Sequence, residues 1–163
     1  MAAYLRVRLK RLAVREAALV RVAELVLAAV GESQSELSID LVGDRRMRRL
    51  NRVYRKKDRT TDVLAFPMRE ALVPHAASLT PEMLGDVVIS VPTALRQAGE
   101  AGRSPDDELV SLLVHGVLHL CGYDHERSKR EAARMHRRER ELLRAIGPAP
   151  HVVIHRATKK RRR

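Results

Sequence analysis

The sequence SPDDELVSLLVHGVLHLCGYDH, residues 104–125, decides the fold because it predicts one long central helix that ends in a sharp turn. Ser104 is a preferred helix N-cap, Pro105 suits the first helical position, and the acidic residues that follow favour the positive end of a helix. Gly122 marks the end, since glycine adopts the left-handed conformation of a helix C-cap at little cost. We therefore expect a helix that runs to about Leu120.

Three of the seven histidines lie in this stretch, at His115, His119 and His125. The first two are four residues apart, which places both imidazoles on one face of a helix and within reach of one metal ion. His125 would point away if the helix continued, but a turn at Gly122 can bring it back as a third ligand. Three nitrogen ligands with an open fourth position are typical of catalytic zinc. We expect one Zn²⁺ ion here.

Two residues beside the ligands have other expected roles. Asp124 is either a hydrogen-bond acceptor for a ligand's imidazole N–H or a turn residue, and both interpretations stay open. Cys121 lies roughly 200° around the helix from His119, so we interpret it as a small core residue and not as a ligand.

The remaining chain alternates irregularly between strand and helix patterns. Apolar patterns predict strands at residues 4–9, 37–41, 61–66 and 87–91. Helical periodicity predicts helices at residues 14–30, at 127–146 and after Asp44. Residues 68–83 contain two prolines and are expected to form a loop. The order is no simple alternation, so we expect an α+β fold with a small mixed sheet of about four strands, about five helices, and the central helix carrying the metal ligands.

The length of 163 residues suits a single domain, which we place at residues 1–150. Residues 151–163 are expected to form a disordered basic tail. Its last eight residues carry six positive charges and no negative one. Such a tail is either a solvated end or an arm that contacts nucleic acid, and composition does not separate the two.

Positive charge dominates the chain, with 32 Lys and Arg against 20 Asp and Glu, a net charge of +12 and a pI of about 10.9. Polyanions are the natural partners of such a surface. The segment 45–59 holds nine basic residues against Asp58 alone, which favours a groove that follows a nucleic-acid backbone.

The N-terminus is charged, no apolar run approaches the roughly 20 residues of a membrane span, and there is one cysteine. These features predict a cytoplasmic protein without a membrane partner.

The spacing H-x3-H-x5-H is also that of the metzincin proteases, so a metalloprotease is an alternative. Those enzymes carry a Glu directly after the first His as the general base, and this chain has Gly116 there. They also place a methionine turn beneath the metal, whereas Met135 lies on the apolar stripe of a predicted helix. The sequence therefore argues against the protease.

Three motifs resemble those of the bacterial YbeY-type endoribonucleases. They are the histidine stretch at 115–125, the stretch LNRVYRKKDRTTDVLAFP at 50–67 and the stretch LGDVVIS at 84–90. The resemblance implies a zinc-dependent, single-strand-specific endoribonuclease that acts in maturation of the 3′ end of 16S ribosomal RNA, late ribosome assembly and ribosome quality control. It implies single-stranded RNA, the rRNA precursor and the small ribosomal subunit with its proteins as partners, with no DNA, and it places Arg55 in the catalytic site.

The general base stays open at this point. A metal hydroxide, Asp86 and the 2′-hydroxyl of the RNA are all compatible with the sequence. Arg55 is expected to pair with the scissile phosphate, because its guanidinium is always charged and binds phosphate through two hydrogen bonds. A non-catalytic ribosome assembly factor with a structural metal is the remaining alternative.

Overall fold

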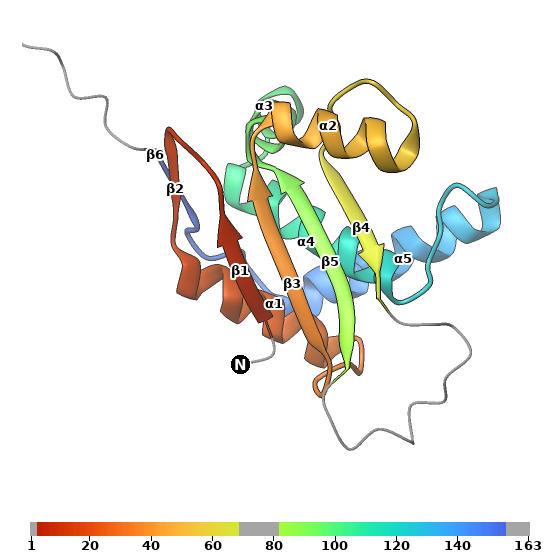
Figure 1. Ribbon diagram of the computed structural model, residues 1–163. Helices are drawn as coiled ribbons and strands as arrows, with labels where there is room; N and C mark the ends of the chain where they lie inside the picture. The colour runs from red at the N-terminus through yellow and green to blue at the C-terminus, as the bar shows by residue number, and fades with distance from the viewer. Residues whose placement is uncertain (1–2, 69–81, 156–163) are drawn as a thin grey trace, which may run out of the picture.

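The computed structural model describes residues 3–68 and 82–155. Its main sheet has four strands in the order β1-β3-β5-β4. Strands β1 (Ala3–Val7), β3 (Glu36–Val42) and β5 (Met83–Ser90) run parallel, and β4 (Val63–Pro67) pairs antiparallel with β5 (Figure 1). The sheet is therefore mixed, as expected.

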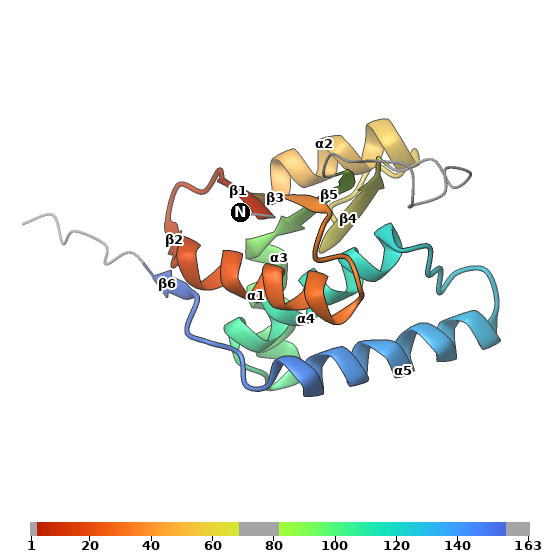
Figure 2. The ribbon, with the colours of Figure 1, turned by 90° about the horizontal axis from the view of Figure 1, so that it is seen from below.

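Helices lie on both sides of this sheet. Helices α1 (Glu16–Ala29) and α4 (Pro105–Leu120) cover one face, and α5 (Lys129–Ile146) packs on both of them as an outer layer (Figure 2). Helix α2 (Asp44–Arg55) lies on the opposite face, and α3 (Val91–Ala101) packs against α4. The predicted α+β class is confirmed.

Two apolar clusters follow from the alternation of side chains along β5. Val87 and Ile89 belong to the main core with α1, α4 and α5, whereas Val88 faces the other way. Val88 packs in a smaller cluster with Met47 of α2 and Leu64 of β4. Because neighbouring residues of a strand point to opposite faces, this one strand serves both cores. The long apolar face of α4 supplies the centre of the main core, where Leu113, for example, is completely buried.

Two features of the fold were not predicted from the sequence. The strand predicted at residues 87–91 stops at Ser90, which is the N-cap of α3 and accepts a hydrogen bond from the Thr93 backbone N–H. Pro92 lies in the first turn of that helix, where its missing N–H costs nothing. A serine before an early proline is the same signal that marks α4 at Ser104.

The second missed feature is a small antiparallel sheet of β2 (Leu12–Val14) and β6 (Val153–His155). Asp106, in the first turn of α4, holds this C-terminal strand. Its Oδ1 accepts hydrogen bonds from the backbone N–H groups of Val152 and Val153, each at 2.8 Å. The domain boundary expected at residue 150 must therefore move to include residues 151–155. The rest of the predicted tail, 156–163, lies outside the described residues, as does 69–81 of the predicted loop.

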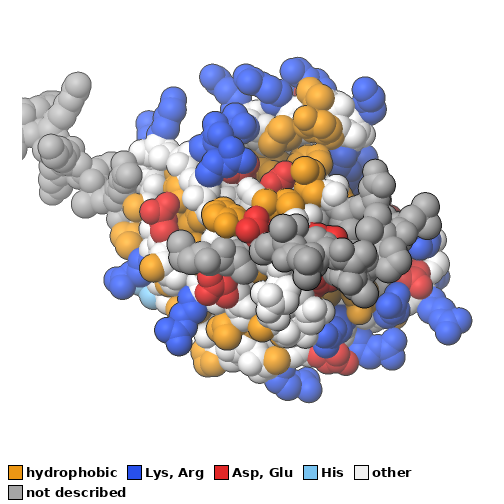
Figure 3. Space-filling model, turned by 60° about the horizontal axis from the view of Figure 1, so that its bottom comes forward, with side chains coloured by type: hydrophobic (Ala, Val, Ile, Leu, Met, Phe, Trp, Pro, Cys, Tyr) orange, Lys and Arg blue, Asp and Glu red, His pale blue; other side chains and the backbone are white. Residues whose placement is uncertain are grey.

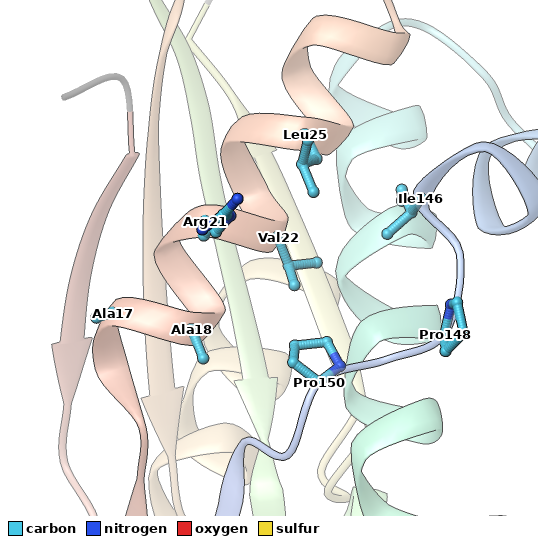
Figure 4. Close-up of a pocket in the computed structure, with 8 residues that line it drawn as sticks. All are labelled: Ala17, Ala18, Arg21, Val22, Leu25, Ile146, Pro148 and Pro150. Atoms are coloured by element: carbon cyan, nitrogen blue, oxygen red, sulfur yellow. The ribbon is translucent and has the colours of Figure 1, made fainter.

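The segment that leads to β6 crosses the outside of α1. Ile146, Pro148 and Pro150 face Val22 and Leu25 across a shallow, mostly apolar hollow (Figure 4). None of its lining residues is among the predicted site residues. Within the described ranges, no helix is long and apolar enough to cross a bilayer.

Candidate metal centre

The three predicted histidines meet at the C-terminal end of α4. The Nε2 atom of His119 lies 3.1 Å from the Nε2 of His115 and 3.1 Å from the Nδ1 of His125. The three candidate ligand atoms all lie within 4.8 Å of one another. Zinc–nitrogen bonds of 2.0 to 2.1 Å in a tetrahedron separate the nitrogens by about 3.3 Å. The two 3.1 Å separations are close to this value, so the three rings lie near the arrangement that one ion requires.

The turn after α4 brings His125 back to the helix. Cys121 caps the helix, and Gly122 follows with a φ of +96°, a conformation that side chains rarely adopt. Asp124 then accepts a hydrogen bond from the Glu126 backbone N–H at 3.0 Å. Of the two roles considered for Asp124, this contact favours the turn residue. Cys121 packs against the main core, as its position on the helix predicted.

Glu139 of α5 orients the first ligand. Its Oε1 lies 2.6 Å from the Nδ1 of His115, which leaves the Nε2 of that ring facing the other two histidines. A carboxylate on the distal nitrogen fixes the tautomer and raises the basicity of a metal-binding imidazole. Sequence reasoning missed Glu139, because α5 is rich in charged residues and no spacing rule links this one to a histidine 24 positions away.

The surroundings of His119 favour its neutral form. Burial lowers the pKa of His119 below its ordinary value, and the neighbouring His115 and His125 lower it further, because a second positive charge there would be repelled. Metals bind the neutral ring, so the environment of His119 suits a ligand.

Gly116 is required by packing. A Cβ atom at this position would lie 2.6 Å from the Cγ1 of Val87 and 3.3 Å from the Cγ2 of Val63. The helix approaches the sheet so closely that the Glu of a metzincin protease has no room there. Packing as well as composition thus excludes the general base of a metzincin protease at this position.

The histidines open into a hollow of about 750 Å³ between α4, β4 and the end of α2. One wall carries Arg55, Lys57 and Arg59, and the floor is formed by residues of β4. Arg55 is 37% exposed, and its guanidinium pairs with Glu126 at 3.2 Å, one residue after His125. Helix α2 ends beside it at Lys56, whose φ of +59° turns the chain into the hollow. The structure therefore places Arg55 and the three histidines in one site.

Asp86 does not belong to this site. Its neighbours in β5, Gly85 and Val87, face α4, so Asp86 points to the opposite face of the sheet. It is also absent from the lining of the hollow. The position of Asp86 thus does not support a role as general base. The carboxylates that line the hollow are Asp62, Asp124 and Glu126.

Comparison with known proteins agrees with this geometry. The family model described as Endoribonuclease YbeY matches residues 6–147. The chain belongs to the Endoribonuclease YbeY family. The match spans all seven elements from β3 to α5, which include those that build the hollow, and it confirms the resemblance carried by the three motifs.

Individual relatives give the same result. The chain is 50% identical to Endoribonuclease YbeY of Geobacter metallireducens over 124 residues, 76% of this chain and 81% of the relative. It is 43% identical to Endoribonuclease YbeY of Aquifex aeolicus over 143 residues, 88% of this chain and 91% of the relative. The solution structure of TM1509 from Thermotoga maritima has the same fold, with a TM-score of 0.60, 24% identity and coverage of 88% of this chain and 89% of that one.

Proposed function

We propose that this chain is a zinc-dependent endoribonuclease that cuts single-stranded RNA. We further propose that it acts in the cytoplasm on the 16S rRNA precursor, in maturation of its 3′ end, in late assembly of the small ribosomal subunit and in ribosome quality control. The observation that carries the proposal is one hollow that combines a three-histidine centre with a wall of basic side chains. Membership in the YbeY family supports the choice of RNA as substrate.

His115, His119 and His125 would hold the zinc ion, which supplies Lewis-acid chemistry at the scissile phosphate. Arg55 binds two oxygens of that phosphate and stabilises the charge that develops on them in the transition state. For this step the guanidinium must exchange Glu126 for the phosphate. This exposed ion pair is held weakly enough to allow the exchange.

The other walls of the hollow hold the flanking nucleotides. Lys57 and Arg59 lie where they can neutralise phosphates next to the scissile one. Tyr54 is 64% exposed and packs edge-on against Phe66, with ring centroids 5.1 Å apart. Such a ring offers a stacking surface to an unpaired base, which single-stranded RNA has and a duplex does not.

Cleavage of a fluorescent single-stranded RNA by the purified protein tests the proposal. We expect Arg55→Ala to lower the cleavage rate about 10²- to 10³-fold, the usual cost of one donor to a transition-state oxyanion. Arg144→Ala is the matched control, because it removes an exposed arginine from the far end of α5 and should leave the rate within about twofold. Equal rates for the two variants would refute the role of Arg55.

The same assay separates the alternatives. Cleavage of casein without cleavage of RNA would establish the metalloprotease. Binding of ribosomal subunits without any RNA cleavage would establish the assembly factor with a structural metal. The product ends then identify the nucleophile, since a 2′,3′-cyclic phosphate requires attack by the RNA's own 2′-hydroxyl and a 5′-phosphate requires water.

A further inference from the structure

A second basic hollow lies at the other end of α2, away from the histidines. It has a volume of about 600 Å³ and lies between the β1–β2 connection and the first half of the helix. Six basic side chains line it: Arg8, Lys10, Arg11, Arg45, Arg46 and Arg49. Figure 3 shows Lys and Arg side chains crowded at the top of the molecule, where α2 lies.

The described residues do not neutralise this charge. All six side chains are exposed, and none of them forms an ion pair with a described residue. Asp44 is the one acidic residue in the lining, and its carboxylate is already occupied. It accepts hydrogen bonds from Thr93 at 2.6 Å and Ser90 at 2.7 Å, and it pairs with Arg96 at 2.8 Å. The hollow thus presents a strong positive field to the solvent.

The backbone of the sheet builds this hollow from two distant parts of the sequence. Strands β1 and β3 are parallel, and Val7 lies opposite Leu41 in the register. The Arg8 N–H extends that pairing by donating to the Leu41 carbonyl at 2.9 Å. Both strands end at the same edge, so the β1–β2 connection and the start of α2 emerge side by side. The position of Arg8 next to α2 is therefore fixed by the fold.

A stripe of arginines along α2 connects the two hollows. Arg45, Arg49 and Arg52 are spaced by four and three residues, and Arg55 follows after three more, so they lie near one face of the helix. The ten residue steps from Arg45 to Arg55 span about 15 Å along the axis, at 1.5 Å per step. Stacked nucleotides advance about 3.4 Å each along a strand, so the distance corresponds to roughly four or five nucleotides.

We propose that the RNA strand bound at the metal centre continues along α2 and that its backbone is held in this second hollow. The inference rests on the proposed function, because it takes the occupant of the metal hollow to be RNA. Continuity favours RNA over a membrane or an acidic protein, since one flexible polyanion can occupy both hollows and the stripe between them. Residues Arg8, Lys10 and Arg11 would then bind phosphates several nucleotides from the cut.

The test compares two RNA lengths on two matched triple variants. The first variant, Arg8→Gln/Lys10→Gln/Arg11→Gln, removes three charges from the second hollow. The control, Arg137→Gln/Arg140→Gln/Arg144→Gln, removes three exposed charges from α5. Each protein is assayed for binding and cleavage of a single-stranded RNA of about 2 nucleotides and one of about 15, because only the longer one can span both hollows.

We expect the first variant to bind the long RNA about tenfold more weakly than the control, with KM raised and kcat unchanged. The slope of log K against log salt should fall by about 2, or roughly 0.7 for each lost phosphate contact. The short RNA should not distinguish the two variants. Equal affinity of both variants for the long RNA would overturn the proposal, as would an equal loss of affinity for both lengths.

The short RNA also separates this inference from the proposed function. If the parent and both variants cleave the short RNA equally, and the two variants also bind the long RNA equally, then RNA binding in the second hollow is refuted and the proposed nuclease function is retained. If no protein cleaves either RNA, the proposed function fails, and the binding data alone decide on the second hollow. A first variant that lost binding to phosphatidylserine vesicles but not to long RNA would assign the hollow to a membrane surface and overturn the proposal.

Discussion

Glu139 controls the metal centre through one contact, its 2.6 Å approach to the Nδ1 of His115. We predict that Glu139→Gln lowers zinc affinity about 10- to 100-fold, because the amide cannot accept the imidazole proton with the strength of a carboxylate. Competition with a chromophoric chelator measures the affinity. Glu141→Gln removes an exposed carboxylate two positions away and should leave the affinity unchanged. Equal affinities for the two variants would show that Glu139 does not support the site.

Gly116 tests how tightly α4 is packed against the sheet. Gly116→Ala should lower the free energy of unfolding by about 1–3 kcal/mol, because the new Cβ collides with Val87 and the gain in helix propensity, about 1 kcal/mol, offsets only part of this cost. Gly99→Ala in α3 has open space around the new Cβ and should raise stability instead. Urea denaturation compares the two. A Gly116→Ala protein as stable as the parent would contradict this, because it would mean that Val87 can move away from the new Cβ at little cost in free energy.

At the level of single residues, the sequence predicts the site residues whose positions follow from local structure, such as helix spacing or a turn. The spacing of His115 and His119 depends on the helix alone, and Gly122 supplies the turn that returns His125. Glu139 depends on how α5 packs across α4, which no spacing in the sequence encodes. The position of Asp86 outside the hollow was not predictable for a similar reason, because the face to which a strand residue points depends on which helix covers the strand.

The contact between Asp106 and the C-terminal strand joins the two ends of the fold. Asp106→Asn should cost about 1–3 kcal/mol at pH 7, because two buried backbone N–H groups lose a charged acceptor. Asp107→Asn is the control, since Asp107 is also in the first turn of α4 but its side chain is exposed. Urea denaturation at neutral pH should separate the two variants. Equal stability would contradict the role given to Asp106.

Acid should abolish this difference. Burial opposes ionisation of Asp106, but the N–H groups of Val153 and Val152 and the side chain of His151 outweigh it and lower its pKa below the ordinary value. A lowered pKa stabilises the fold fully above about pH 4, the ordinary value for Asp, and the stabilisation disappears as the pH falls through the folded-state pKa. The stability gap between the parent and Asp106→Asn should therefore close in acid. A gap that stays constant from pH 7 to pH 2 would contradict this assignment.

Elements with long or strongly patterned sequences were predictable, and short ones were not. The apolar periodicity of α1, α4 and α5 marks them directly, and the β-branched run of β5 marks a strand buried on both faces. Strands β2 and β6 have three residues each, too few to show a pattern, and their pairing depends on a contact with Asp106 across the fold. Helix α3 was not predicted, although Ser90 and Pro92 signal its start, because its first residue, Val91, continues the apolar run of β5.

The molecule as a whole combines an apolar core with a cluster of positive charge along α2. Helix α4 passes through the centre of the main core and presents its histidines where it emerges, while α2 carries arginines across the opposite face of the sheet. The two surfaces meet at the hollow beside β4, which belongs to both. This arrangement lets one extended polyanion contact the metal centre and the basic helix together.

Titration of metal-free protein with zinc, followed by cleavage of single-stranded RNA, tests the central claim most directly. We predict that the metal-free protein is inactive, that the rate rises in proportion to added zinc up to one ion per chain, and that it then stays constant. His119→Ala should remain inactive throughout, while circular dichroism shows that it is folded. Cleavage by the metal-free protein at the full rate, or by His119→Ala at the parental rate, would contradict the account.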